Sequence, residues 1–248
     1  MDPIVQALIA TLVISLISLV GVVFFFADWS PQRGMVFMSF AAGVLLATAF
    51  LEILPSALER HAGTQNLLAA TLAAIGAFFV LERVLHGLHD HDTHESHAVP
   101  SGYLILVGDT LHNFVDGVVI AATFLADPAL GVATTIAVAA HELPQEIADY
   151  GVLLSSNFTR TGALLWNFLS GLAAVLGALL CWGFQDWIEP HLAWVMASTA
   201  GMFIYVAAAD LMPELHHART RDAWRYTVPF FVGVLLIAVL GAIIPDAH

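Results

Sequence analysis

Eight stretches of about 20 mostly apolar residues follow one another along this chain of 248 residues. At about 1.5 Å per residue, a helix of that length crosses the hydrocarbon core of a bilayer, which is roughly 30 Å thick. We place the stretches at residues 4–26, 34–58, 67–85, 103–126, 130–155, 163–184, 193–215 and 228–244. The sequence therefore predicts an all-α polytopic membrane protein with eight transmembrane helices, forming a single domain over residues 1–248.

The composition agrees with a membrane protein and excludes other classes. Hydrophobic residues make up 59% of the chain and charged residues only 11%, as is typical of polytopic helical proteins. Cys181 is the single cysteine, which excludes a disulfide framework and a cysteine-based zinc finger. A formal net charge of -13 is not the signature of a nucleic-acid-binding protein, but it is compatible with handling cations. The first stretch lacks a basic start, so we expect a retained span rather than a cleaved signal peptide.

The arginines predict the orientation in the membrane. Alternate connections between the eight stretches hold six of them, namely Arg33, Arg83, Arg160, Arg219, Arg221 and Arg225. The opposite side holds only Arg60. Positive residues accumulate on the cytoplasmic side, so we expect both termini to be extracytoplasmic.

Ionisable residues are concentrated in four of the stretches, the second, fourth, fifth and seventh. They are Glu52; His112 and Asp116, beside Asn113; His141, Glu142, Glu146 and Asp149; and Asp210 and Glu214. A carboxylate at the bilayer centre costs roughly 2.5 to 3.5 kcal/mol, so such groups face protein or water and not lipid. These four helices should form a polar inner bundle around a pathway.

A weak internal repeat relates the two ends of the chain. Residues 52–55 and 210–213 both read acid-x-x-Pro, one in the second stretch and one in the seventh. Three helices, a central pair and three helices of inverted topology form the 3+2+3 pattern of secondary transporters, whose site lies at the repeat interface.

Helical spacing groups the polar residues of the central pair. His112, Asn113 and Asp116 share one helix face. Two stripes follow in the next stretch: His141, Gln145 and Asp149; and Glu142, Glu146 and Asp149. Pro144 lacks the donor for the carbonyl of Ala140 and should kink this helix beside the stripes.

The depth of these residues in the membrane brings the polar faces of the two helices together. His112 lies about nine residues into a helix entering from the cytoplasm, and His141 about eleven into a helix entering from outside. Both reach the midplane and can share a metal ion. Towards the ends of the pathway we expect Glu52 on the outer side and Asp210, Glu214, His216 and His217 on the cytoplasmic side. Asp149 and Asn167 fit a supporting role that orients the ligands.

Five histidines follow the third stretch, in a predicted cytoplasmic loop at about residues 86–100. They are His86, His89, His91, His94 and His97. Short histidine-rich tracts bind metals, whereas a flexible solvated loop explains the same composition, and the sequence leaves both interpretations open.

The motifs resemble those of the ZIP (Zrt/Irt-like protein) zinc transporters over nearly the whole chain. Residues 112–117, HNFVDG, are similar to the family's fourth-span signature, and residues 141–146, HELPQE, to its fifth-span signature. The resemblance implies a prokaryotic member in the bacterial inner membrane, moving zinc, and often iron, manganese or cadmium, into the cytoplasm. It also implies a central site that is often binuclear, with ligands at His112, Asn113, Asp116, His141, Glu142 and Gln145; Glu146 is a further candidate.

Two positions depart from the family pattern. Gln145 stands where the family commonly has Glu or His, and Asp116 where Glu is commoner. Loss of an anionic bridging ligand at position 145 argues against two tightly held ions.

Rival functions remain at this point. An intramembrane metalloprotease would need His-Glu-x-x-His, but its second histidine is replaced by Gln145. A zinc-dependent hydrolase using His112, His141 and His216 stays open, as does a proton or sodium carrier. Imidazole and carboxylate ligands suit zinc and also iron, manganese, cobalt or cadmium as the transported substrate. The hypothesis is thus a divalent metal importer and not an enzyme; its oligomeric state is undecided, with a homodimer as one arrangement.

Overall fold

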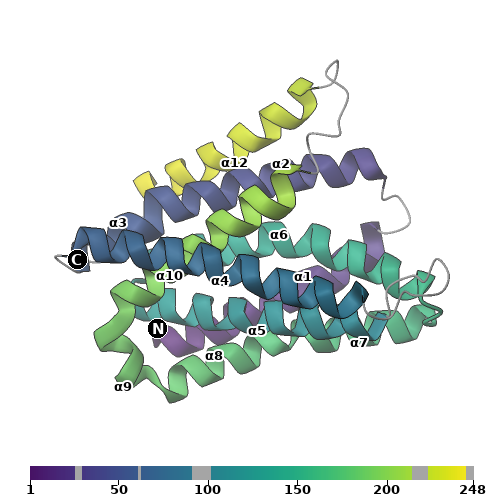
Figure 1. Ribbon diagram of the computed structural model, residues 1–248, viewed down its shortest axis with the longest axis horizontal. Helices are drawn as coiled ribbons and strands as arrows, with labels where there is room; N and C mark the ends of the chain where they lie inside the picture. Colours follow the sequence, from purple (N-terminus) through teal and green to yellow (C-terminus); the bar gives the residue numbers. More distant parts are fainter. Residues whose placement is uncertain (26–29, 61–62, 91–101, 214–222, 244–248) are drawn as a thin grey trace.

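The computed structural model describes the chain except for residues 26–29, 61–62, 91–101, 214–222 and 244–248. Within the described residues every regular element is a helix, and most run along the long axis of a bundle (Figure 1). In chain order they are α1 (Pro3–Phe25), α2 (Pro31–Ala47), η2 (Thr48–Ile53), α3 (Leu54–Arg60), α4 (Thr64–Asp90), α5 (Gly102–Ala126), α6 (Pro128–Ser155), α7 (Arg160–Gly171), α8 (Ala173–Gly183), α9 (Gln185–Ile188), η3 (Glu189–His191), α10 (Leu192–Tyr205), η4 (Val206–Leu211) and α12 (Ala223–Ile243).

Six helical segments among the described residues are long and apolar enough to cross a membrane. They are Gln32–Arg60, Thr64–Leu81, Ile105–Ala126, Arg160–Gly183, Gln185–Ala209 and Trp224–Ile243. The other two predicted spans correspond to α1, with 23 residues, and α6, with 28 residues. Helix α6 is long enough, but its three acids lower its hydropathy. Six predicted spans are thus confirmed by length and composition, and the total of eight stays a prediction.

The start of α1 and the end of α12 lie at the same end of the bundle, as do α3 and α9 (Figure 1). A chain that begins and ends on one side crosses the bundle an even number of times. This arrangement fits termini on a common side of the membrane.

The acid-x-x-Pro repeats overlap the ends of two π-helical segments of six residues each, η2 and η4. Proline has no N–H, and its ring crowds the carbonyl four residues earlier, which favours a wider turn. Accordingly, the N–H of Leu54 donates to the carbonyl of Ala49, and that of Met212 to the carbonyl of Ala207, five residues back in both cases. The sequence repeat therefore has a local structural counterpart.

The helices contact one another in two groups. Helices α1, α5, α6, α7 and α8 pack together, while α2, η2, α3, α4, α10, η4 and α12 form the second group. Contacts of α6 with α2 and η2, and of α5 with α10, join the groups. The buried share of the spans in the predicted inner bundle is 56% for Gln32–Arg60, 50% for Ile105–Ala126 and 61% for Gln185–Ala209. Among the other spans it is 11% for Thr64–Leu81, 17% for Trp224–Ile243 and 44% for Arg160–Gly183. The inner position predicted for these three spans agrees with their burial.

Glycines allow α5 and α8 to approach closely. A Cβ atom at Gly117 would overlap the backbone carbonyl of Ala174, and one at Gly177 would overlap that of Phe114. Small residues at crossings are the usual means by which membrane helices pack. This crossing fixes the part of α5 that carries the signature polar residues.

We expect Gly177→Leu to destabilise the fold, because its side chain meets backbone atoms that cannot rotate away. Overpacking typically costs about 1–3 kcal/mol. Thermal unfolding and size-exclusion profiles in detergent measure the effect. Gly183→Leu on the same helix is the matched control, since a Cβ atom at Gly183 would meet no neighbouring atom within 4 Å. Equal stability of the two variants would contradict the packing argument.

Candidate metal centre

A tight hairpin of α5 and α6 carries the central polar residues. Asp127 alone separates the two helices, and its carboxylate caps α6 by accepting from the N–H groups of Ala129 and Leu130 at 2.7 and 3.2 Å. Arg60 of α3 donates from Nη2 to the carbonyl of Ala126, the last residue of α5, at 2.5 Å. A guanidinium there satisfies a helix-terminal carbonyl. The turn of the hairpin is therefore fixed at both of its helix ends.

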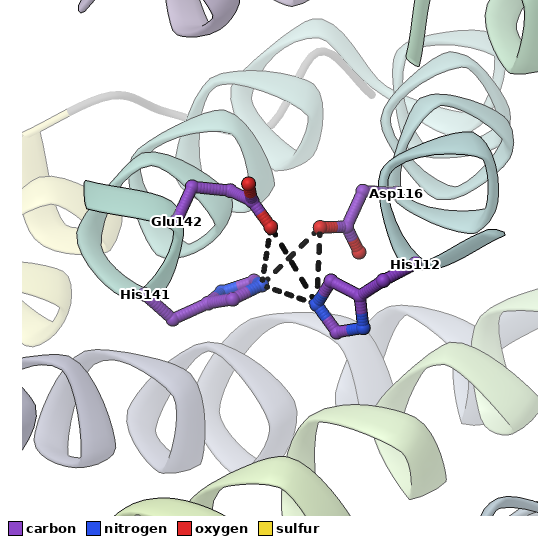
Figure 2. A group of neighbouring side chains, drawn as sticks. All are labelled: His112, Asp116, His141 and Glu142. Atoms are coloured by element: carbon purple, nitrogen blue, oxygen red, sulfur yellow. Dashed lines mark hydrogen bonds and ion pairs between the residues drawn. The ribbon is translucent and has the colours of Figure 1, made fainter. Parts of the chain in front are cut away.

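Four side chains converge between these helices, His112 and Asp116 from α5 and His141 and Glu142 from α6 (Figure 2). The Nε2 atoms of the two histidines are 3.2 Å apart. Asp116 Oδ2 lies 3.7 Å from His112 Nε2 and 3.2 Å from His141 Nε2. Glu142 Oε1 lies 3.5 Å from His112 Nε2 and 3.6 Å from His141 Nε2. One ligand atom from each residue thus faces a common centre.

These distances match a tetrahedral zinc shell. Zinc–nitrogen and zinc–oxygen bonds of about 2.0–2.2 Å place tetrahedral ligand atoms about 3.3–3.6 Å apart. The exposed fraction is 0% for Asp116 and Glu142 and 1% for His141. One oxygen of Asp116 and both oxygens of Glu142 have no hydrogen-bond partner. A buried carboxylate is costly unless its charge is compensated, so a cation at this centre would stabilise the donor set.

A backbone hydrogen bond orients the imidazole of His141. Its Nδ1 lies 3.0 Å from the carbonyl of Ala137, which can only accept, so Nδ1 carries the proton. In the neutral ring, Nε2 then presents its lone pair to the centre. Such a bond to the far nitrogen is the usual support of a metal-binding histidine.

A second group lies beside the first and consists of Asp109, Glu142 and Glu146. Their carboxylate oxygens lie within 4.8 Å of one another, all three are buried, and Glu142 belongs to both groups. Asn113 donates from Nδ2 to Asp109 Oδ1 at 2.9 Å and to the Asp109 carbonyl at 3.2 Å. The structure therefore directs the amide of Asn113 towards Asp109, a residue that the sequence analysis missed. The missed signal is its spacing, since Asp109 precedes His112 by three residues and Asn113 by four on the same face.

The other predicted residues of α6 and α7 lie around these groups. Asn167 of α7 donates from Nδ2 to the carbonyl of Glu146 at 3.0 Å, which ties α7 to α6. Gln145 and Asp149 are half-buried, and Asp149 belongs to neither group. Pro144 lies inside α6, which continues as one helix from Pro128 to Ser155.

Among the residues predicted for the ends of the pathway, Glu52 has a described side chain, and it belongs to neither group. Glu52 lies in η2 with its carboxylate against Gly241 of α12. Asp210 lies in η4, and its side chain is outside the description. Helix α4 continues to Asp90, so it includes His86 and His89, whose side chains are likewise not described. The remaining predicted residues lie outside the described residues, namely His91, His94, His97, Glu214, His216 and His217.

Comparison with known proteins identifies the family. A family model described as ZIP Zinc transporter matches residues 2–102 and 85–241. Zinc transporter ZIP13 of Pongo abelii is 32% identical over 202 residues, which cover 76% of this chain and 60% of that protein. Zinc transporter ZIP10 and zinc transporter ZIP6 of Homo sapiens are 37% and 38% identical over 52% and 54% of this chain, and 18% of each of those proteins. The chain thus spans 60% of the first relative and less of the others. Over nearly its whole length, it belongs to the ZIP zinc transporter family.

Proposed function

We propose that this chain moves divalent metal ions, zinc first among them, into the cytoplasm through the α5–α6 centre. The observation that carries the proposal is the set of four donor atoms at 3.2–3.7 Å spacings, three of them from buried residues and one from the half-buried His112. Membership of the ZIP family supports transport as the activity. Nitrogen and oxygen donors without thiolate also admit iron, manganese, cobalt and cadmium as substrates.

The two ligand groups suggest a route for the ion. The first group has two nitrogen and two carboxylate donors, and the second has three carboxylates. Glu142 belongs to both, so an ion can pass from one to the other without losing this ligand. Asp109 lies earlier in α5 and Glu146 later in α6, which places the second group nearer the predicted cytoplasmic ends of both helices. We infer that the second group accepts the ion on its way inward.

The second group also supplies the negative charge that Gln145 lacks. The sequence argued against two ions because Gln145 supplies no charge. Asp109 and Glu146 bring carboxylates to the neighbouring position without Gln145. Two ions are therefore compatible with the charges of this site, one in each group.

A hydrolase fits the geometry less well than a transporter. Catalytic zinc sites keep an open position for water beside three protein ligands. Here four protein donors fill the tetrahedron of the first group. The matched relatives bear the names of zinc transporters, which likewise favours metal movement over hydrolysis.

We further propose an eight-span chain in a bacterial inner membrane with both termini extracytoplasmic and a 3+2+3 inverted repeat. The packing of helix pairs supports the repeat. In this repeat the second span, α2, corresponds to the seventh, α10, and the third span, α4, corresponds to the eighth, α12. The contact between α2 and α12 therefore corresponds to the contact between α10 and α4. The same exchange relates η2 to η4.

Removing a ligand of the first group should abolish zinc uptake. Loss of supporting residues alone commonly costs 10–100-fold in affinity, so His141→Ala and Asp116→Ala should cost at least that. Folding should stay nearly intact because little apolar packing is lost. Zinc uptake in proteoliposomes measures the effect, and His191→Ala, at an exposed histidine of η3, is the control. Full uptake by either ligand variant would contradict the site.

Asp109→Ala should distinguish metal binding by the second group from metal binding by the first. It leaves all four ligands of the first group in place, so one ion should still bind tightly while a second is lost. Metal analysis of the purified protein gives the stoichiometry, with Asp186→Ala in α9 as the control acid. An unchanged stoichiometry would show that Asp109 is not a ligand.

Orientation can be tested with single cysteines in a Cys181→Ser background. The arginine distribution predicts that a cysteine at position 61 reacts with an impermeant reagent from outside. One at position 93 should react only from the cytoplasm. The reverse labelling would overturn the proposed direction of import.

A further inference from the structure

An apolar groove opens on the surface of the bundle between α4 and α10, with α5 as its floor. Its volume is about 650 Å³. Four alanines of α4 form one wall, namely Ala70, Ala73, Ala74 and Ala77, and Val115 and Val119 of α5 form the floor. These valines stand one residue before and three residues after Asp116. An occupant of the groove would therefore pack directly behind the metal-binding part of α5.

The position of the groove favours an acyl chain as its occupant. Along α4 the groove extends from Ala70 to Phe78, about 12 Å at 1.5 Å per residue. These residues lie in Thr64–Leu81, a candidate membrane span of which only 11% is buried inside the bundle. The groove is lined mostly by apolar side chains and opens to the surface, so hydrocarbon from the surrounding bilayer can enter it along its length.

One end of the groove carries aromatic and acidic groups. Trp187 of α9 is 66% exposed and stacks on His191, with ring centroids 5.0 Å apart and 26° between the planes. His191 donates from Nδ1 to the carbonyl of Trp187 at 2.8 Å, which fixes this stack. Asp186 precedes Trp187 and Glu189 follows it, and no Lys or Arg occurs between residues 161 and 218. Aromatic faces and carboxylates attract an ammonium group and disfavour an anionic headgroup.

We propose that this groove binds a phospholipid with a zwitterionic headgroup that ends in an ammonium group, phosphatidylethanolamine, from the surrounding bilayer. One of its acyl chains lies along the alanines and its ammonium group at the α9 rim. The bound chain supports α5 through Val115 and Val119. This inference rests on the membrane placement in the proposed function, but it concerns lipid binding and not metal movement.

Native mass spectrometry of the full chain tests the proposal after incubation in nanodiscs of equal phosphatidylethanolamine and phosphatidylglycerol. We expect the wild type to retain phosphatidylethanolamine by about fivefold over phosphatidylglycerol, the size expected for one cation–π contact with ion pairing. Ala77→Phe fills the groove and should abolish this retention. The double variant Asp186→Asn with Glu189→Gln should keep a bound lipid and lose the headgroup preference.

Leu72→Phe is the matched control, because Leu72 is 69% exposed on α4 and does not line the groove. It should retain lipid as the wild type does. Ala73→Phe replaces Ala77→Phe if the latter does not fold. Equal lipid retention by the groove and control variants would overturn the proposal, as would equal retention of the two lipids by the wild type. A dimer that dissociates in Ala77→Phe would assign the groove to a second copy instead. This experiment measures lipid retention and not zinc uptake, so failure of this proposal is distinct from failure of the proposed transport.

Discussion

Two buried carboxylates between α5 and α6 determine the requirements on the rest of the structure. Asp116 and Glu142 are fully inaccessible, and three of their four oxygens lack a hydrogen-bond partner. In an apolar interior such charges are costly, and a cation between them would compensate the charge. The turn at Asp127 and the Arg60 contact fix α5 and α6 at one end, and the glycine crossing packs α5 against α8. The scaffold therefore holds the carboxylates and imidazoles at the distances that the proposed metal ion needs.

The convergence of the four central side chains could be predicted from sequence because helical periodicity fixes their faces. His112 and Asp116 are four residues apart, and His141 follows at the same depth in the next helix, so their meeting needs no tertiary detail. Asp109 was missed because it lies outside the recognisable motif. The direction of the Asn113 amide and the position of Glu52 against Gly241 depend on rotamers and on how α12 packs. Spacing along one helix cannot specify either of them.

The π-helical segments illustrate the same limit. The repeated acid-x-x-Pro pattern indicated that residues 52–55 and 210–213 correspond, but not that the turns before Pro55 and Pro213 would widen. The widening follows from where each freed carbonyl finds its next donor, which is a property of the folded backbone. Segment η2 contacts α10 and segment η4 contacts α2, so each local irregularity occurs where the two ends of the chain pack together.

The single-residue turn at Asp127 has a consequence for biogenesis. His112 and Glu142 belong to two consecutive helices, so the complete first ligand set leaves the ribosome within one hairpin. Inserted separately, each helix would bring its acids into lipid at roughly 2.5 to 3.5 kcal/mol per carboxylate. When the two helices insert as a pair, their imidazoles and carboxylates face one another. The pair can then enclose an ion before the remaining helices insert. If the hairpin binds metal as proposed, we expect metal supply during synthesis to affect the yield of correctly inserted protein.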